Sequence, residues 1–278
     1  MHETKTMKLP DLSNMMSVGQ LRYIQAHCES AEYCNPDAVV GTFLSSQQRL
    51  ACIFRGKLLM PRLRANPFYY YVLARTKYYD EVFLDAVYGS ADCIINIGCG
   101  SDTRAYRYAH ILKQKGVEVW ECDQPQAIYT KQKIAQKHWP TDHIKYVPLD
   151  LNDNEWPNFA ALFDEKRQGS KLIMMEGVSP YIRSESFKKF LDFLATKLDA
   201  RSSLAYDFKI SGTVDDLGRS ETIRQPFRLP AKLEEVAAYH GSLGFQVQHM
   251  ELSTALVKRL LPEASPLFGE DCLLRITL

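Results

Sequence analysis

The chain has 278 residues, with 34 lysines and arginines against 33 aspartates and glutamates, and a formal net charge of +1. This balance gives no electrostatic footprint for nucleic acid or an anionic membrane, so we expect a small or neutral partner. The length suits one large α/β domain with a helical extension. No run approaches the roughly 18 apolar residues of a transmembrane helix, and residues 1–13 lack the apolar core of a signal peptide. We therefore expect a cytoplasmic chain whose seven scattered cysteines are reduced thiols.

The first half of the chain is predicted to begin with helices. Residues 18–64 show helical periodicity interrupted by breaks, and residues 67–88 form one long, aromatic-rich helix. Val72, Tyr79 and Val82 share a face of that helix, which favours core packing over an aromatic binding site.

Residues 91–104, ADCIINIGCGSDTR, are the segment around which the rest is organised. Their apolar, partly β-branched start predicts a buried parallel strand. Gly98 and Gly100 bracket Cys99 where the strand should end, and N-capping residues then begin a helix. A strand, a glycine turn and a helix form the first unit of a nucleotide-binding α/β fold. Thr103 stands where a dinucleotide fingerprint requires a third glycine, which disfavours a nicotinamide-dependent oxidoreductase.

The next strand, within residues 117–125, ends in two acids. Glu121 and Asp123 are two residues apart and should point to the same side. A carboxylate at the end of the second strand suits two ribose hydroxyls. Alternatively, Asp123 caps the helix that Pro125 begins.

The remaining pattern continues the alternation of strands and helices. Strands are predicted at 145–149, 171–175, 203–210, 245–250 and 272–278, and helices at 126–139, 159–166, 184–198 and 233–243. The last two strands are expected to pair antiparallel at the sheet edge. Residues 211–230, rich in glycine, proline and charge, are predicted to be a lid-like insertion.

Four motifs, GCGSDTR (98–104), ECDQP (121–125), PLDL (148–151) and EGVSPY (176–181), together resemble the leucine carboxyl methyltransferase family. The resemblance is clear over residues 69–193 and holds elsewhere by layout. It implies a class I S-adenosylmethionine-dependent O-methyltransferase: a Rossmann-like, seven-stranded, mostly parallel sheet with helices on both faces. It also implies a helical cap over residues 1–88 and a core over residues 89–278.

The resemblance also implies roles for single residues. Arg75 would meet the methionyl carboxylate of S-adenosyl-L-methionine, Glu176 would contact the cofactor, and Tyr181 would lie near the methyl-transfer site. The other cofactor-binding residues implied are Gly98, Cys99, Gly100, Asp123, Asp150 and Leu151, the last two at the adenine. Simpler readings stay open: an Arg75–Asp80 salt bridge, a turn begun by Asp150, a turn capped by Glu176 and a packed Tyr181.

For the reaction we expect direct displacement, in which an oxygen nucleophile attacks the sulfonium methyl without a metal. The predicted acceptor is a hydroxyl on a small, hydrophobic specialised metabolite of polyketide or peptide type, as in bacterial natural-product tailoring. Asp207, at the end of the fifth predicted strand, would take its proton and Tyr181 would orient the oxygen. The alternatives are methylation of a carboxyl group, on a protein C-terminus or a small molecule, and a non-catalytic cofactor-binding protein.

Overall fold

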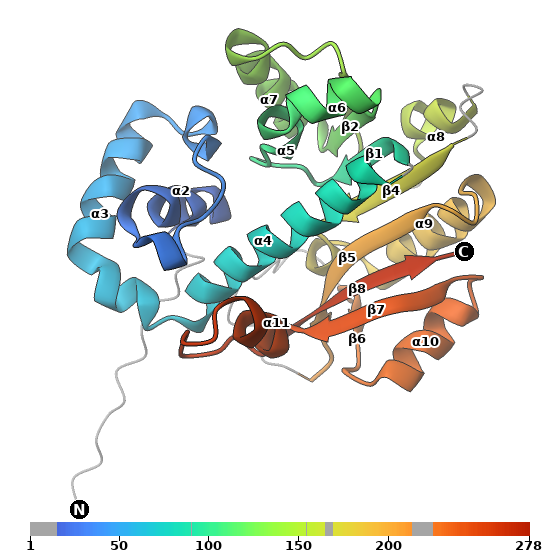
Figure 1. Ribbon diagram of the computed structural model, residues 1–278. Helices are drawn as coiled ribbons and strands as arrows, with labels where there is room; N and C mark the ends of the chain where they lie inside the picture. Colours follow the sequence, from blue (N-terminus) through green and yellow to red (C-terminus); the bar gives the residue numbers. More distant parts are fainter. Residues whose placement is uncertain (1–15, 90, 154, 165–168, 213–224) are drawn as a thin grey trace, which may run out of the picture.

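A mixed sheet organises the computed structural model, which describes residues 16–89, 91–153, 155–164, 169–212 and 225–278 (Figure 1). Its strands are β1 (Ala91–Ile97), β2 (Glu118–Asp123), β3 (Ile144–Pro148), β4 (Ser170–Met175), β5 (Ser203–Ile210), β6 (Arg228–Leu229), β7 (Gln246–Leu252) and β8 (Asp271–Thr277). The order across the sheet is β3-β2-β1-β4-β5-β8-β7, with the two-residue β6 beside β5. The predicted seven-stranded sheet is thus confirmed, and β6 is an addition.

The strand directions place the carboxyl ends of five strands at one edge. Strands β1 to β5 run parallel to one another, and β8 runs antiparallel to both β5 and β7. Alternation along β1 separates two cores: Ile94 packs on one face of the sheet, and Cys93, Ile95 and Ile97 pack on the other. A strand buried on both faces explains why its sequence is continuously apolar.

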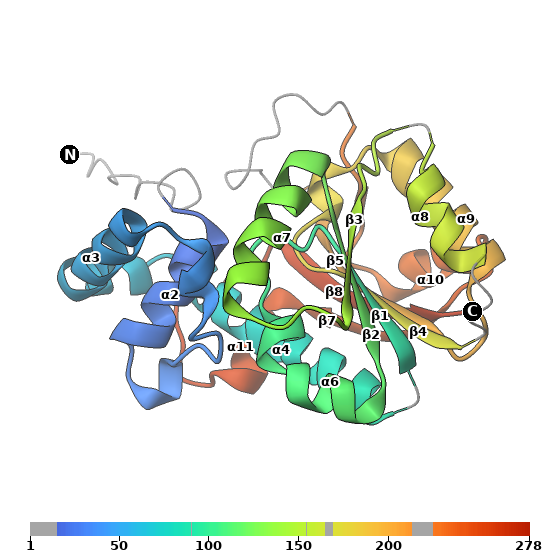
Figure 2. The ribbon, with the colours of Figure 1, turned by 90° about the horizontal axis from the view of Figure 1, so that it is seen from above.

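Helices cover both faces of the sheet, as Figure 2 shows. On the Ile94 face lie α4 (Pro67–Tyr88), α5 (Arg104–Arg107), α6 (Ala109–Lys115), α7 (Pro125–His138) and α11 (Ser253–Leu260). On the opposite face lie α8 (Pro157–Asp164), α9 (Ser184–Lys197) and α10 (Leu233–Gly241). The 3₁₀ turn η3 (Ser179–Tyr181) follows β4. The predicted layers are confirmed, and ligands of such sheets bind outside the carboxyl ends of the strands.

The N-terminal helices lie beside this core. They comprise α2 (Val18–Cys28), the 3₁₀ turns η1 (Ala31–Tyr33) and η2 (Val40–Phe43), and α3 (Ser46–Arg64). The two α-helices each begin with a capping box, made by Ser17 with Gln20 and by Ser45 with Gln48. Helix α4 packs along the sheet instead. By its contacts α4 therefore belongs with the sheet, although the predicted boundary at residue 88 assigns it to the cap.

Two local features differ from the sequence pattern. The helix predicted after the glycine turn is interrupted at Tyr108, which separates α5 from α6. Helix α11 is not predicted from the sequence. In the predicted lid, residues 213–224 lie outside the described part of the chain. In the part that is described, no helix combines the length and apolarity needed to cross a membrane.

Candidate functional site

The turn after β1 requires glycine for two reasons. Gly98 and Gly100 have φ values of 65° and 40°, a region that side chains disfavour. At Gly98 a Cβ atom would also lie 2.3 Å from the Cγ2 atom of Val178. The turn is fixed to the next strand because the Cys99 amide donates to the carbonyl of Cys122 over 3.1 Å. The two glycines therefore leave the backbone of the turn uncovered by side chains at the edge where the parallel strands end.

A cleft of about 430 Å³, here called the outer cleft, opens beside this turn. Its walls include five predicted site residues: Gly98, Asp123, Asp150, Leu151 and Tyr181. The carboxyl ends of β1, β2, β3 and β4 bring these residues together from positions up to 83 apart in the sequence. The structure thus assembles the acids and the apolar neighbour that the sequence analysis placed at the strand ends.

Asp123 braces the glycine turn. One of its oxygens accepts the Gly100 amide at 2.7 Å, and the other accepts the Gln124 amide at 2.8 Å. The N-cap of α7 is Gln124, with no side-chain cap bond, so Asp123 does not cap that helix as the alternative supposed. Its half-buried carboxylate faces the outer cleft.

Glu121, the neighbouring acid, points elsewhere. It is fully buried, accepts from Lys131 at 2.7 Å and Tyr106 at 2.6 Å, and lines neither cleft. Burial raises the pKa of Glu121, and the positive charge of Lys131 opposes that shift. Lys131 also lies 3.4 Å from the Cys99 carbonyl, so the pair supports the turn from behind.

Asp150, Leu151 and Tyr181 line the outer cleft in different ways. Asp150 accepts the Asn152 amide at 2.9 Å, the turn predicted as its alternative role, yet it also faces the cleft. Leu151 is buried and supplies an apolar wall. Tyr181 is 47% exposed, so it is not the packed aromatic of the simpler reading.

A second cleft of about 260 Å³, here called the inner cleft, shares Gly98 and Gly177 with the first. Arg75 and Glu176 line it, together with the start of α2. Arg75 is 5% exposed; its Nε lies 3.3 Å from Glu176 Oε1, and its Nη1 lies 3.4 Å from Asp207 Oδ2. These contacts replace the Arg75–Asp80 pair that the sequence left open, because Asp80 pairs with other arginines.

Asp207 lies behind Arg75 and lines neither cleft. It is 1% exposed and accepts from the Gly177 amide at 2.7 Å and from Tyr79 at 3.0 Å. Burial raises the pKa of Asp207 to about 6, against the opposing effect of Arg75. These contacts make Asp207 a support for both the Arg75 guanidinium and the turn after β4.

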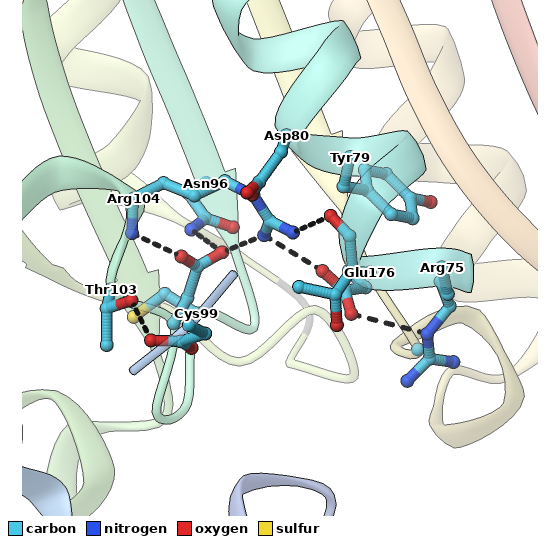
Figure 3. A network of polar contacts seen from close by, with 12 residues as sticks. Arg75, Tyr79, Asp80, Asn96, Cys99, Thr103, Arg104 and Glu176 are labelled. Atoms are coloured by element: carbon cyan, nitrogen blue, oxygen red, sulfur yellow. Dashed lines mark hydrogen bonds and ion pairs between the residues drawn. The ribbon is translucent and has the colours of Figure 1, made fainter. Parts of the chain in front are cut away.

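A buried ion network joins the two ends of this site (Figure 3). Arg104 is fully buried and donates to Asp80 at 2.7 Å, Asp102 at 2.5 Å and Glu176 at 2.9 Å. Arg107 reaches the same Asp80 through two 2.7 Å bonds. Burial alone would raise the pKa of Asp80, but Arg104 and Arg107 hold it below its ordinary value. Glu176 is thus held between two arginines and does not cap the following turn.

Two functional candidates were not found from the sequence. Arg22 of α2 lines the inner cleft, is 5% exposed, and donates to Ser101 Oγ at 2.9 Å. Asp37 forms an ion pair with Arg22, with Oδ2 3.0 Å from Nη1, and its Oδ1 accepts a hydrogen bond from the Thr103 hydroxyl at 2.5 Å. Gly19 lets α2 approach, since a Cβ there would lie 2.6 Å from Ser101 Oγ. Contacts across 79 residues leave no signal in local periodicity.

Comparison with curated proteins finds partial relatives. A candidate S-adenosyl-L-methionine-dependent methyltransferase of Mycobacteroides abscessus is 29% identical over 157 residues, 56% of this chain and 50% of that protein. One of Mycobacterium avium is 31% identical over 141 residues, 49% of this chain and 43% of that protein. The chain therefore spans about half the length of the curated relatives it matches.

Among solved structures, a magnesium protoporphyrin IX methyltransferase of Synechocystis gives a TM-score of 0.47 at 15% identity, covering 74% of this chain and 84% of that one. Mitomycin 7-O-methyltransferase gives 0.45 at 14%, covering 85% and 59%. The model of one family, leucine carboxyl methyltransferase, matches residues 25–195. Because that match covers more than half of the 278 residues, the chain belongs to the leucine carboxyl methyltransferase family.

Proposed function

We propose that this protein is an S-adenosyl-L-methionine-dependent O-methyltransferase whose two clefts hold the cofactor. The observation that carries the proposal is the meeting of the clefts at Gly98 and Gly177. One long ligand can then lie across the glycine turn, with a nucleoside in the outer cleft and an amino acid moiety in the inner one. Family membership supports the same cofactor.

The inner cleft fits a methionyl group. Arg22 and Arg75 are both buried there. Among the described residues Nε of Arg22 has no hydrogen-bond partner, whereas Nε of Arg75 faces Glu176 Oε1 at 3.3 Å. Guanidinium forks suit a carboxylate, which would supply the acceptor that Arg22 Nε lacks. Glu176, 12% exposed at its side chain, would accept from the amino group. The donor set therefore matches a zwitterionic amino acid.

The outer cleft fits an adenosine. Asp123 faces it as a carboxylate that can accept two ribose hydroxyls. Asp150 stands where the exocyclic amine would donate, and Leu151 supplies an apolar surface for the ring. Polar groups at a few fixed points on apolar walls are typical of small-molecule sites.

When bound, S-adenosyl-L-methionine supplies an electrophilic methyl group on its sulfonium sulfur. The chain contributes alignment and exclusion of water. We propose a hydroxyl of a small, hydrophobic specialised metabolite as the acceptor, with Tyr181 orienting it from the cleft wall. Asp207 positions the Arg75 guanidinium and the Gly177 amide. That it also takes the proton of the acceptor hydroxyl stays a prediction. Carboxyl methylation of a protein C-terminus or small molecule is the alternative, and a non-catalytic binding protein is the second.

The cytoplasmic location and the division into a cap of residues 1–88 and a core of residues 89–278 are proposed with this function. Residues of the cap line the inner cleft, which supports a cap over the cofactor.

Calorimetric titration of the full chain with S-adenosyl-L-methionine, S-adenosylhomocysteine and NAD tests the proposal. We expect both sulfur compounds to bind and NAD not to bind. Mass spectrometry of hydroxyl and carboxyl model acceptors then reports methyl ethers or esters. Binding of NAD alone would overturn the cofactor assignment, and methyl esters alone would shift the reaction to the carboxyl alternative. Cofactor binding without transfer to either acceptor class would favour the non-catalytic reading.

A further inference from the structure

Helix α3 is strongly basic, although the net charge of the whole chain is close to zero. Its 19 residues include Arg49, Arg55, Lys57, Arg62 and Arg64 and no acid, although the net charge of the chain is only +1. Such basic helices are typical of contacts with anionic surfaces. Positive charge alone does not define an interaction site. The apolar residues of the helix provide the second, independent observation.

The outward face of α3 is apolar. Leu50, Phe54 and Leu58 are 73%, 65% and 62% exposed, and their spacing of four places them in one stripe. The opposite side is packed, with Cys52 and Leu63 buried against the rest of the cap. A helix that is apolar on two sides is normally covered on both. Figures 1 and 2 agree that α3 is the helix of the cap farthest from the sheet.

Cations flank this stripe on both sides. At about 100° per residue, Lys57 projects about 60° to one side of Phe54 and Arg62 about 80° to the other. Among the described residues, ion pairing occupies Arg64, which is bound to Glu29, but no ion pair with Arg55, Lys57 or Arg62 occurs. Long cationic side chains beside an apolar stripe can reach lipid headgroups while the stripe enters the acyl boundary.

We propose that the outer face of α3, defined by Leu50, Phe54, Lys57, Leu58 and Arg62, docks on an anionic lipid surface. Charge complementarity favours this occupant over a second copy of the chain, because copies would bring two helices of five cations together. Three apolar side chains also fall short of the about 800 Å² per partner of a standard protein interface. Because α2 lines the inner cleft and packs on α3, docking would hold the cap and its cleft at the lipid surface.

Co-sedimentation of the full chain with vesicles tests the proposal. The two probes are vesicles of phosphatidylcholine alone and of phosphatidylcholine with phosphatidylglycerol, at low and high salt. We expect binding to the anionic vesicles only, weakened by salt. Phe54→Gln with Leu58→Gln, and separately Lys57→Glu with Arg62→Glu, should each lower the partition coefficient at least about tenfold.

Matched controls sit away from α3. Leu233→Gln removes another exposed leucine, and Lys133→Glu with Lys137→Glu reverses two exposed charges on α7. Both should bind vesicles as the unmodified chain does. Absence of binding to anionic vesicles, or equal loss in controls and α3 variants, would overturn the proposal. A change of sedimentation coefficient in the α3 variants without vesicles would assign the face to self-association instead, which also overturns it.

Discussion

Arg104 and Glu176 form a buried ion pair, with Nη1 of the arginine 2.9 Å from Oε2 of the glutamate. The pair ties the helix after the glycine turn to the end of β4. Arg104 also faces the buried Asp80 and Asp102, so Arg104→Met would leave three carboxylates, two of them buried, with one cation fewer. Removing one partner of a buried ion pair costs about 3–5 kcal/mol. We expect the free energy of unfolding, measured by urea denaturation, to fall by that amount.

A surface pair provides the control for this prediction. Lys188 and Asp192 pair at 2.8 Å on α9 with side chains 56% and 50% exposed. Exposed pairs contribute about 0–1 kcal/mol, so Lys188→Met should change stability little. Equal small losses in the two variants would show that the Arg104 network does not stabilise the fold.

The role of Asp207 can be decided by Asp207→Asn. Its contacts with Arg75 and the Gly177 amide predict that the variant mainly weakens cofactor binding, because the inner cleft loses its support. A general base would instead contribute about 10²–10⁴ in rate. Turnover lowered at least about tenfold at saturating cofactor, with unchanged affinity, would therefore restore the base assignment. Steady-state kinetics combined with calorimetry separates the two.

The pH dependence of stability gives a second view of Asp207. Burial raises its pKa to about 6 in the folded chain, whereas an unfolded aspartate titrates near about 3.9. The folded state then binds the proton more tightly, so the contribution of Asp207 is fully present below about pH 4 and is lost as the pH rises through about 6. We expect the melting temperature of the unmodified chain to fall relative to that of Asp207→Asn across this window. A constant difference between the two would contradict the raised pKa.

Most of the fold is predictable because its central strands, such as β1 and β4, are buried on both faces. The segment 203–210 is predicted as a strand and coincides with β5, which is buried from Ser203 to Lys209. Helix α11 is not predicted because its eight residues follow β7 directly, without glycine or proline to mark a turn between them. The break at Tyr108 is likewise local backbone geometry that helical periodicity does not record.

The candidate site was predictable only in part. Acids at strand ends, such as Asp123 and Asp150, follow from parallel topology, because the carboxyl ends of neighbouring strands meet. Which partner each acid takes depends on contacts between distant segments. Glu121 pairs with a buried lysine while Asp123 faces the cleft, although both lie on β2. Arg22 enters the site only through the packing of α2 on the glycine turn.

Arg22→Lys tests the methionyl half of the site. The substitution keeps the charge and removes the guanidinium fork. We expect the affinity for S-adenosyl-L-methionine to fall by about 1.5–3 kcal/mol, the range for hydrogen bonds to a charged group. Binding of 5′-methylthioadenosine, which lacks the amino acid carboxylate, should be unaffected. Arg201→Lys, at a 65% exposed side chain, serves as the control and should bind both ligands normally. Equal loss for both ligands in Arg22→Lys would show a general disturbance of the cap.

Asp123→Ala tests most directly the central claim that the outer cleft holds the adenosine. Titration calorimetry with S-adenosyl-L-methionine and 5′-methylthioadenosine should show both affinities lowered by about 1.5–3 kcal/mol, because the two ligands share the ribose. Asp142→Ala, which removes a carboxylate with a 71% exposed side chain, should leave both unchanged. A folded Asp123→Ala variant that binds both ligands with full affinity would contradict the placement of the cofactor.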